Sequence, residues 1–310
     1  MSFAVRFNYS YKGKYLFTFS NRWDGVSQFS AGHKWDSFPA GAIAWRISDE
    51  PFMNVAKNWL NNLKLRVGYG ITGNSGGVDA YGTTTQAYVY TGNGLTLNGQ
   101  NSSFTQYTGT YGSKDLGWEK SYNWNVGLDY GILNNRLDGS IEWFKTTTKG
   151  LLFKRTLPIT SGLTGWGSPL SIWQNIAETS NQGVEVTINS HNIKTKDFSW
   201  TTSLNLSHNK NKIVKLADLP EFIDGNYIRK EGCSYATIYL REYAGVDPND
   251  GRPMYYDNKE DENGNRSRNI VYDPNDADRV ELKDIYPKLT GGLMNTFNYK
   301  SVSYTHLTLP

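Results

Sequence analysis

Residues 117–149, GWEKSYNWNVGLDYGILNNRLDGSIEWFKTTTK, alternate clearly between apolar and polar side chains. From 118 to 130 the even positions hold Trp, Lys, Tyr, Trp, Val, Leu and Tyr, and the odd positions hold only Glu, Ser, Asn, Gly and Asp. Because the side chains of a strand alternate between its two faces, this arm has one mostly aromatic face and one polar face. After a break at 131–135 the alternation resumes from Leu137 to Trp143. The stretch therefore predicts a long two-armed β-hairpin with a tight connection.

Two environments suit such a hairpin. In a soluble sandwich the apolar face is the core, and strands average about five or six residues. In an outer-membrane barrel the apolar face meets lipid, the polar face lines the lumen, and each strand needs roughly 9–11 residues to cross. Each arm here has about 13 residues or more, with Trp and Tyr toward the arm ends as well as the middle. Strand length and aromatic placement favour the barrel.

The composition of the 310 residues narrows the class of protein. Mean hydropathy is -0.58, and no apolar run approaches the roughly 18 residues of a membrane helix, which excludes a helical membrane protein but not a barrel. Aromatic residues make up 14%, a content that suits strands and interfacial girdles. The net charge of +3 balances 32 basic against 29 acidic residues without a basic, aromatic cluster, which argues against nucleic-acid binding. The lone Cys233 cannot form an internal disulfide.

Further strands follow from the same alternation. A second hairpin is expected from residues 3–11 and 15–20, joined by the short turn 12–14. Residues 63–71 alternate most strictly, and their Lys and Arg side chains indicate a charged lumen face. The remaining expectations are a loop at 22–35, a strand at 36–47, a short helix at 52–61, loops at 73–116 and 150–181, strands at 182–192 and 197–210, a polar region at 211–288 with hairpins near 235–246 and 252–257, and a last strand at 289–299.

The lengths of the connections carry a separate argument. Those after residues 11, 130 and 192 are short, those after 21, 72, 149 and 210 are long, and 48–61 is intermediate. This order puts the long connections at one end of the sheet, as in outer-membrane barrels, which have short periplasmic turns and long external loops. About nine strands result, whereas bacterial single-chain barrels have even numbers. With no export signal ahead of the first strand, we expect part of a larger barrel.

The chain resembles the SusC/RagA class of TonB-dependent outer-membrane transporters from Phe3 to Lys300, and the order and spacing of several segments together carry the resemblance. The segments are RWDGVSQF (22–29), KWDSFPAGAIAWRIS (34–48), WLNNLKLRVGYGITGN (59–74), LGWEKSYNWNVGLDYGILNNRLDGSIEWF (116–144), NQGVEVTIN (181–189), FSWTTSLNLSHNKNKI (198–213), YAGVDPNDGRPMYYD (243–257) and YPKLTGGLMNTFNYK (286–300).

The resemblance implies an all-β fold, an antiparallel transmembrane barrel of about 22 strands around a plug, in the bacterial outer membrane. It implies residues 1–300 to be a partial barrel without the plug, the TonB-contacting segment, the export signal and the final strands. The tail 301–310, SVSYTHLTLP, does not fit the family's continuation. We expect it to be non-native, and sequence divergence at a strand end is the alternative. The implied partners are outer-membrane lipid, a SusD-like surface lipoprotein, the TonB complex acting through the plug, and an oligosaccharide or peptide substrate.

No catalytic, metal or cofactor motif stands out, so we expect no enzyme and no cofactor. His33, His191, His208 and His306 are scattered without partners at metal-ligand spacing, and His208 has the apolar parity of its strand, which favours an interfacial position. The acidic runs 257–261 and 273–278 are expected to be solvated turns, because Lys259 interrupts the calcium-loop register. An outer-membrane barrel enzyme would need a clustered nucleophile and base, which the sequence does not offer.

Aromatic residues in the long loops are the candidate substrate contacts. Tyr107, Tyr111, Trp166 and Trp173 lie in polar, Gly-rich surroundings, and aromatic faces stack on sugar rings or peptide side chains. Packing of loop against loop is the alternative role. Our leading hypothesis is a fragment of a TonB-dependent nutrient importer. The alternative is a soluble β-rich carbohydrate-binding module, which explains the Trp and Tyr content but not the sorted loops.

Overall fold

The computed structural model describes residues 1–90, 96–97, 100–101, 104–107, 110–165, 168–216 and 220–308. The chain divides into two compact units, which are considered separately: Met1–Asn209 with Leu289–Pro310, and Lys210–Lys288. In the described ranges, helical segments are all too short or too polar to cross a membrane.

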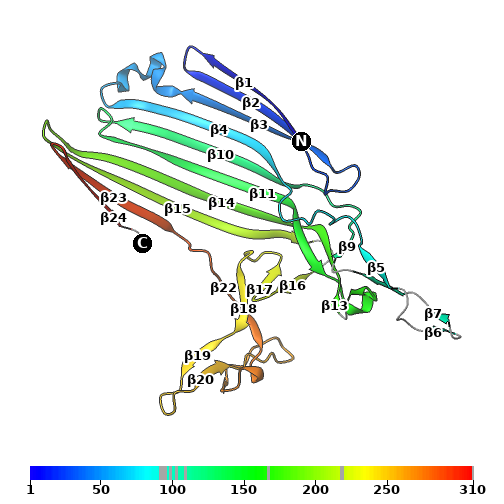
Figure 1. Ribbon diagram of the computed structural model, residues 1–310. Helices are drawn as coiled ribbons and strands as arrows, with labels where there is room; N and C mark the ends of the chain where they lie inside the picture. Colours follow the sequence, from blue (N-terminus) through cyan, green and yellow to red (C-terminus); the bar gives the residue numbers. More distant parts are fainter. Residues whose placement is uncertain are drawn as a thin grey trace. The chain divides into compact units, whose positions relative to one another are not determined.

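The first unit is built on one large sheet of long strands (Figure 1). Its hydrogen-bonded order is β1-β2-β3-β4-β10-β11-β14-β15-β23-β24, so each strand neighbours the next long strand of the chain, and the short β9 (Thr110–Tyr111) joins β14 in parallel. The bounds are β1 (Ser2–Tyr11), β2 (Tyr15–Gly25), β3 (Trp35–Arg46), β4 (Leu60–Asn74), β10 (Glu119–Ile132), β11 (Leu137–Thr156), β14 (Ser171–Lys194), β15 (Phe198–Leu216), β23 (Thr290–Tyr299) and β24 (Val302–Thr308).

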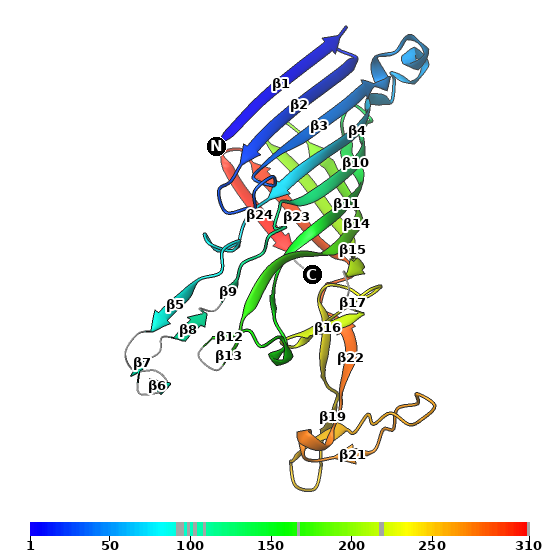
Figure 2. The ribbon, with the colours of Figure 1, turned by 90° about the vertical axis from the view of Figure 1, so that its right-hand side faces the viewer.

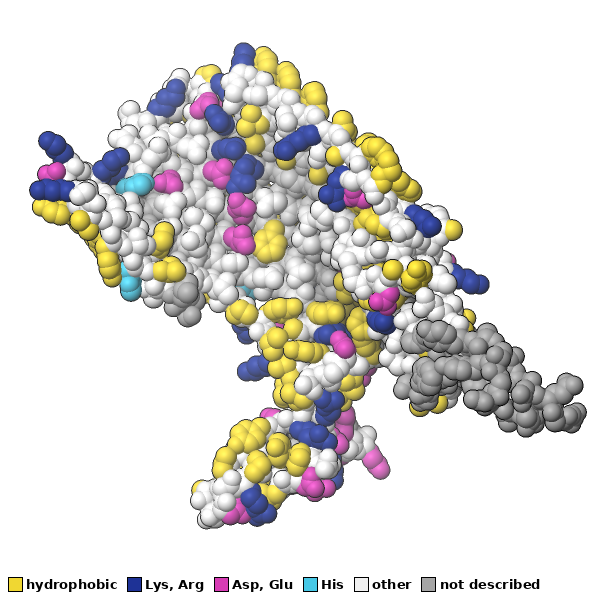
Figure 3. Space-filling model, in the orientation of Figure 1, with side chains coloured by type: hydrophobic (Ala, Val, Ile, Leu, Met, Phe, Trp, Pro, Cys, Tyr) yellow, Lys and Arg dark blue, Asp and Glu magenta, His cyan; other side chains and the backbone are white. Residues whose placement is uncertain are grey.

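The sheet is a single curved layer. Figure 2 shows its middle strands bowed to one side and its two edges, β1 and β24, curling toward the other. On the apolar face, Trp124 and Trp143 keep 48% and 41% of their surface exposed, and Ile43 keeps 57%. The concave face turned toward the viewer in Figure 3 is mainly polar, with charged side chains near its middle. Within the part of the chain that the structure describes, the aromatic face of the 117–149 hairpin therefore meets no second layer of protein, which confirms the predicted barrel wall and disagrees with a sandwich.

The two arms of the 117–149 hairpin, β10 and β11, pair from Lys120 opposite Lys149 to Ile132 opposite Leu137. At its turn Leu133, Asn134 and Asn135 adopt positive φ angles of 54°, 57° and 56°. Asparagine tolerates this left-handed conformation better than most residues, and this explains how so short a connection reverses the chain.

Short and long connections lie at opposite ends of the sheet, as predicted (Figure 1). The short ones are 12–14, 133–136, 195–197 and 300–301, and 47–59 lies at the same end. The long-connection end carries 26–34, 75–118, 157–170 and 217–289.

Several predicted boundaries were wrong. The loop expected at 150–181 is mostly strand, because β11 continues to Thr156 and β14 begins at Ser171. Register shifts between Lys149 and Leu152, with Gly150 at a φ of 64°, interrupt the alternation there and hid the continuation. The expected loop at 22–35 shortens to 26–34, since β2 runs on to Gly25 in unbroken register with β3.

Other segments differ in kind. The helix expected at 52–61 is replaced by two 3₁₀ helices, η1 (Ile47–Asp49) and η2 (Pro51–Ala56). The 73–116 segment, expected to be loop throughout, contains short strands, and the 157–170 connection has its own small elements. These are β5 (Ala87–Tyr90), β6 (Thr96–Leu97), β7 (Gln100–Asn101), β8 (Phe104–Tyr107), η3 (Ile159–Ser161), β12 (Thr164–Gly165) and β13 (Ser168–Pro169).

The tail contains a strand. Val302–Thr308 forms β24 and pairs with β23 from Tyr299 opposite Val302 to Leu293 opposite Thr308. The described residues therefore contain ten long strands in this sheet, one more than the approximate count predicted. Whether the tail is native stays a prediction.

The second unit has two small sheets in place of the hairpins expected near 235–246 and 252–257. One has the order β16-β17-β18-β22 and the other β19-β20-β21. The bounds are β16 (Glu221–Asp224), β17 (Tyr227–Lys230), β18 (Thr237–Arg241), β19 (Tyr243–Val246), β20 (Pro253–Tyr256), β21 (Ile270–Val271), η4 (Pro274–Asp276) and β22 (Arg279–Asp284).

Candidate functional site

The concave face of the first unit is lined by paired polar side chains, and this face is the candidate site. Gly127 of β10 lies directly opposite Arg66 of β4 on one side and Glu142 of β11 on the other. Since Gly127 has no side chain, the Arg66 guanidinium can extend across β10 and donate to Glu142. A Cβ at residue 127 would lie 2.9 Å from Arg66 Nη2.

Arg66 also binds a second carboxylate. Its Nε donates to both oxygens of Asp129, at 3.1 and 3.0 Å, and its Nη2 donates to Asp129 Oδ1 at 2.8 Å. Lys64 Nζ lies 3.8 Å from Asp129 Oδ2, and Asn125 donates to Glu142 at 3.3 Å. Two cations and two carboxylates thus form a neutral cluster, about a quarter to a third exposed, at the wall surface.

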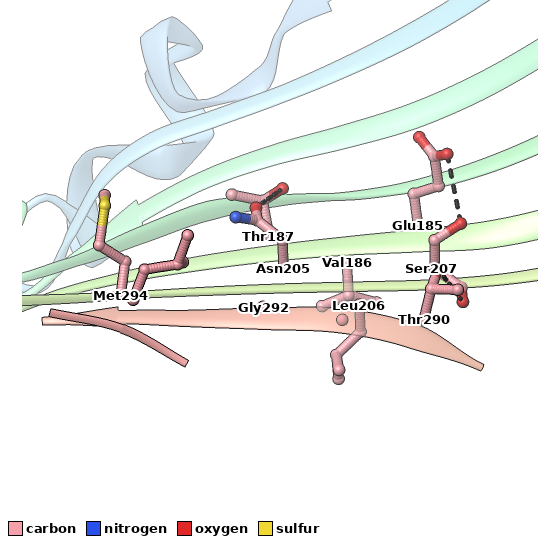
Figure 4. Close-up of a pocket in the computed structure, with 11 residues that line it drawn as sticks. Glu185, Val186, Thr187, Asn205, Leu206, Ser207, Thr290, Gly292 and Met294 are labelled. Atoms are coloured by element: carbon pink, nitrogen blue, oxygen red, sulfur yellow. Dashed lines mark hydrogen bonds between the residues drawn. The ribbon is translucent and has the colours of Figure 1, made fainter. Parts of the chain in front are cut away.

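A second polar ladder crosses β11, β14 and β15. Asn189 donates to Asp138 at 3.0 Å and accepts from Ser203 Oγ at 2.8 Å. Thr187 donates to Asn205 at 3.1 Å, and Ser207 donates to Glu185 at 3.4 Å. Figure 4 shows these last two pairs on one side of the strands and Leu206 on the other.

This ladder borders a shallow pocket of about 530 Å³ that extends to β23 and β24. Its lining combines polar side chains of β14 and β15 with the apolar Val186, Leu206, Met294 and Leu307, and more of it is apolar than polar. The polar ladder beside the pocket, and not the pocket itself, presents hydrogen-bond donors and acceptors to a polar solute. Among the described residues, no cluster of three or more His, Cys, Asp and Glu could hold a metal ion.

A small core at the long-connection end holds one predicted substrate contact. Phe29, Val78 and Leu116 are buried together there, and Trp118, Leu152 and Trp173 pack against them. Trp173 lies on β14, not in a loop as predicted. Its Nε1 donates to Asp79 Oδ2 at 3.1 Å.

Asp79 fixes the start of the 75–118 connection to the wall. Lys154 Nζ donates to the same Asp79 oxygen at 2.9 Å and lies 5.8 Å from the centre of the Trp173 ring. The hydrogen bonds from Lys154 and then from Trp173 hold the pKa of Asp79 below its usual value. The end of the connection is fixed as well, because the Asn175 side chain accepts from Gly117 N at 2.9 Å and donates to Gly117 O at 3.0 Å.

Of the other predicted substrate contacts, the structure describes Tyr111 and the backbone of Tyr107. Tyr111 is half-buried on β9 and pairs with Ile172, the residue before Trp173. Tyr107 ends β8 opposite Ala87, but its side chain lies outside the described residues, as does the whole of Trp166. The structure thus places Tyr111 beside β14, paired with the neighbour of Trp173, but shows no contact between the Tyr111 and Trp173 side chains within the described residues. Sequence reasoning missed Asp79 and Lys154, since neither belongs to a periodic pattern before the strand extension is known.

The acidic runs form turns as predicted, and Asp261 and Asp273 are exposed, but Asp257 is buried and not solvated as predicted. Asp257 accepts from the Ser267 hydroxyl at 2.9 Å, Asp261 accepts from the Asn265 backbone at 2.7 Å, and Asp273 caps η4. The hydrogen bonds from Asn269 first, with those from Ser267 and the backbone, lower the pKa of Asp257.

A curved single-layered sheet with a polar concave face, an exposed apolar face and long connections at one end defines the wall of an outer-membrane β-barrel. The family model for the TonB dependent receptor-like β-barrel matches residues 2–229. The chain belongs to this family of outer-membrane receptors and transporters.

The relatives are of the SusC/RagA type, as the resemblance implied. The chain is 34% identical to the TonB-dependent receptor SusC of Bacteroides thetaiotaomicron, over 98% of this chain and 30% of that protein. It is 35% identical to the TonB-dependent receptor P3 of Formosa agariphila, over 96% of this chain and 30% of that protein. A solved structure of the RagAB peptide transporter superposes with a TM-score of 0.78 at 28% identity, covering 99% of this chain and 32% of that chain. The chain therefore spans about a third of the length of these relatives.

Proposed function

We propose that the chain forms part of the barrel of a TonB-dependent importer of oligosaccharides or peptides. The observation that carries the proposal is the two-sided sheet: it offers an apolar surface to lipid and a face with many polar side chains to a solute in the lumen. The similarity to SusC and to the RagAB peptide transporter supports the transport class, and the RagAB name supports peptides as one substrate class; oligosaccharides rest on the resemblance to the SusC/RagA class alone.

The same similarity supports two partners for the whole transporter. A SusD-like surface lipoprotein would cover the long-connection end, and the TonB complex would supply energy through a plug. In this arrangement the wall neither binds a cofactor nor catalyses a reaction. It confines the solute and positions the external loops.

Uptake by the complete transporter that contains this wall tests the proposal. Cells that carry it should accumulate labelled oligosaccharide or labelled peptide, and accumulation should cease when TonB is removed. Purification from the membrane should retain a surface lipoprotein. Accumulation that is independent of TonB would contradict the proposal.

Alanine substitution tests the aromatic residues as substrate contacts. We propose that replacing Trp173 or Tyr111 by Ala lowers substrate binding severalfold, and the same holds for Tyr107 and Trp166. Asp79→Asn is the control for Trp173, because it weakens the loop anchor and keeps the indole ring. Equal losses in Trp173→Ala and Asp79→Asn would leave Trp173 only its packing role.

A further inference from the structure

The short-connection end of the sheet carries an excess of free positive charge. Every connection at that end has at least one exposed basic side chain in it or directly beside it. These side chains are Lys12, Arg46, Lys57, Arg136, Lys194, Lys196 and Lys300.

The charges of this basic rim are not neutralised within the protein. Among the described residues, none of the seven belongs to an ion pair; Lys14, in the first turn, is paired with Glu50 at 3.3 Å and is left out of the rim for that reason. The exposed acids in the same connections are Asp49 and Asp197. Seven cations against two carboxylates leave a net charge of +5 at this edge, although the whole chain has only +3.

Figure 3 shows dark blue side chains recurring along the left and upper edge, where Figure 1 places the short connections. Strands lie about 4.8 Å apart, so successive hairpin turns recur at roughly 10 Å along the edge. The cations are therefore distributed as a row and do not form one compact site. A row of that kind suits many small anions side by side better than a single ligand.

Aromatic side chains accompany the row on the apolar side. Tyr11, Tyr15, Trp59 and Tyr299 lie at strand ends of this edge with about half of their surface exposed. Lys12 Nζ lies 5.3 Å from the Tyr11 ring centre, and Lys300 Nζ lies 5.4 Å from that of Tyr299. Rings of this kind sit at the depth of lipid headgroups, which places the neighbouring ammonium groups among phosphates.

We propose that the basic rim binds the headgroups of anionic phospholipids in the leaflet on the short-connection side of the barrel. Each Lys or Arg near a membrane surface adds electrostatic attraction that falls off within a Debye length. The row thereby fixes the depth of the wall at this side and selects for anionic lipid around it. The inference rests on the proposed barrel function, since it needs the apolar face in the bilayer.

Vesicle flotation tests the proposal with the full chain. The probes are vesicles of phosphatidylcholine alone and vesicles with a third of phosphatidylglycerol. Wild-type protein should bind the anionic vesicles at least about tenfold more tightly at low salt, and the preference should shrink at high ionic strength. The variant with Lys12, Lys57, Lys194 and Lys196 all replaced by Gln should lose most of the preference.

A matched variant controls for net charge. Replacing Lys34, Lys114, Lys259 and Lys283, which are exposed and do not belong to the rim, by Gln removes the same number of charges and should leave the preference intact. Equal losses in both variants, or no preference in the wild type, would overturn the proposal. Failure of the wild type to float with either vesicle would instead contradict the barrel function itself.

Discussion

At the scale of single residues, Gly127 is the position on which the lumen charge cluster depends. Gly127→Val should displace the Arg66 guanidinium from Glu142, because a Cβ there would lie 3.1 Å from Arg66 Cζ and 3.4 Å from Glu142 Cγ. We expect a loss of about 1–3 kcal/mol in the free energy of unfolding, as for a partly buried charged hydrogen bond. Urea unfolding in detergent micelles, followed by circular dichroism, measures it.

Gly68→Val is the control for that substitution. Gly68 also faces the concave side, but an added Cβ would have only Ala42 Cβ at 3.9 Å and Gly41 O at 4.0 Å as near neighbours. We expect little change in its unfolding midpoint. Equal losses in the two variants would show that the guanidinium path over Gly127 is unimportant.

The contacts of Asp79 with Lys154 and Trp173, which fix the 75–118 connection to the wall and form the loop anchor, are sensitive to acid. Its pKa is held below the ordinary value of 3.8 by the hydrogen bonds from Lys154 and then Trp173. The anchor therefore contributes its full stability above pH 3.8 and loses it as the pH falls through the lower pKa of the folded state. The emission of Trp173 is obtained by subtracting the spectrum of Trp173→Phe from that of the wild type. Between pH 7 and 2.5, this emission should shift to the red only below pH 3.8. In an Asp79→Asn background this emission should not vary with pH, and a persistent acid shift there would refute the assignment.

At the scale of elements, the backbone conformation of the turn between β10 and β11 restricts which residues can occupy it. Asn134 and Asn135 have φ angles of 57° and 56°, a conformation that β-branched side chains disfavour. Asn134→Val should lower the free energy of unfolding by about 1–2 kcal/mol. Asn134→Gly should be nearly neutral, because glycine adopts this conformation freely. Thermal or urea midpoints decide the matter, and a Val variant as stable as the Gly variant would contradict the turn geometry.

The strands themselves could be predicted because period-two alternation is local. The parity of residues 63–71 and 118–130 places their side chains on the correct faces before any neighbour is known. The alternation fails at bulges, and for this reason the continuation of β11 through Gly150 to Thr156 was missed. The type of helix at 51–56 was missed because apolar spacing barely separates a 3₁₀ turn from an α-helical one.

The sequence predicts on which face of the sheet each residue of the candidate site lies, but not which residues contact one another. The sequence places Arg66 and Glu142 on polar faces, but their contact depends on the register of three strands across Gly127. Register is set by pairing between segments far apart in the chain, so one sequence does not reveal it. The anchor of Trp173 to Asp79 joins residues 94 positions apart and was missed for the same reason.

At the scale of the whole molecule, the apolar face must meet lipid once the protein is in a membrane. Trp124 and Trp143 lie on that face with a little under half of their surface exposed, so nitroxide-labelled acyl chains should quench their fluorescence while aqueous iodide should not. The double variant Trp124→Phe, Trp143→Phe is reconstituted into vesicles in the same way. The quenching that it loses relative to the wild type is the part of the lipid-dependent quenching due to these two residues. Trp173, packed at the long-connection end, provides the comparison, and Trp173→Phe should change this quenching much less. Protection of Trp124 and Trp143 from both quenchers would mean that protein covers the face, and a soluble layered fold would then explain the aromatic pattern better than a barrel wall.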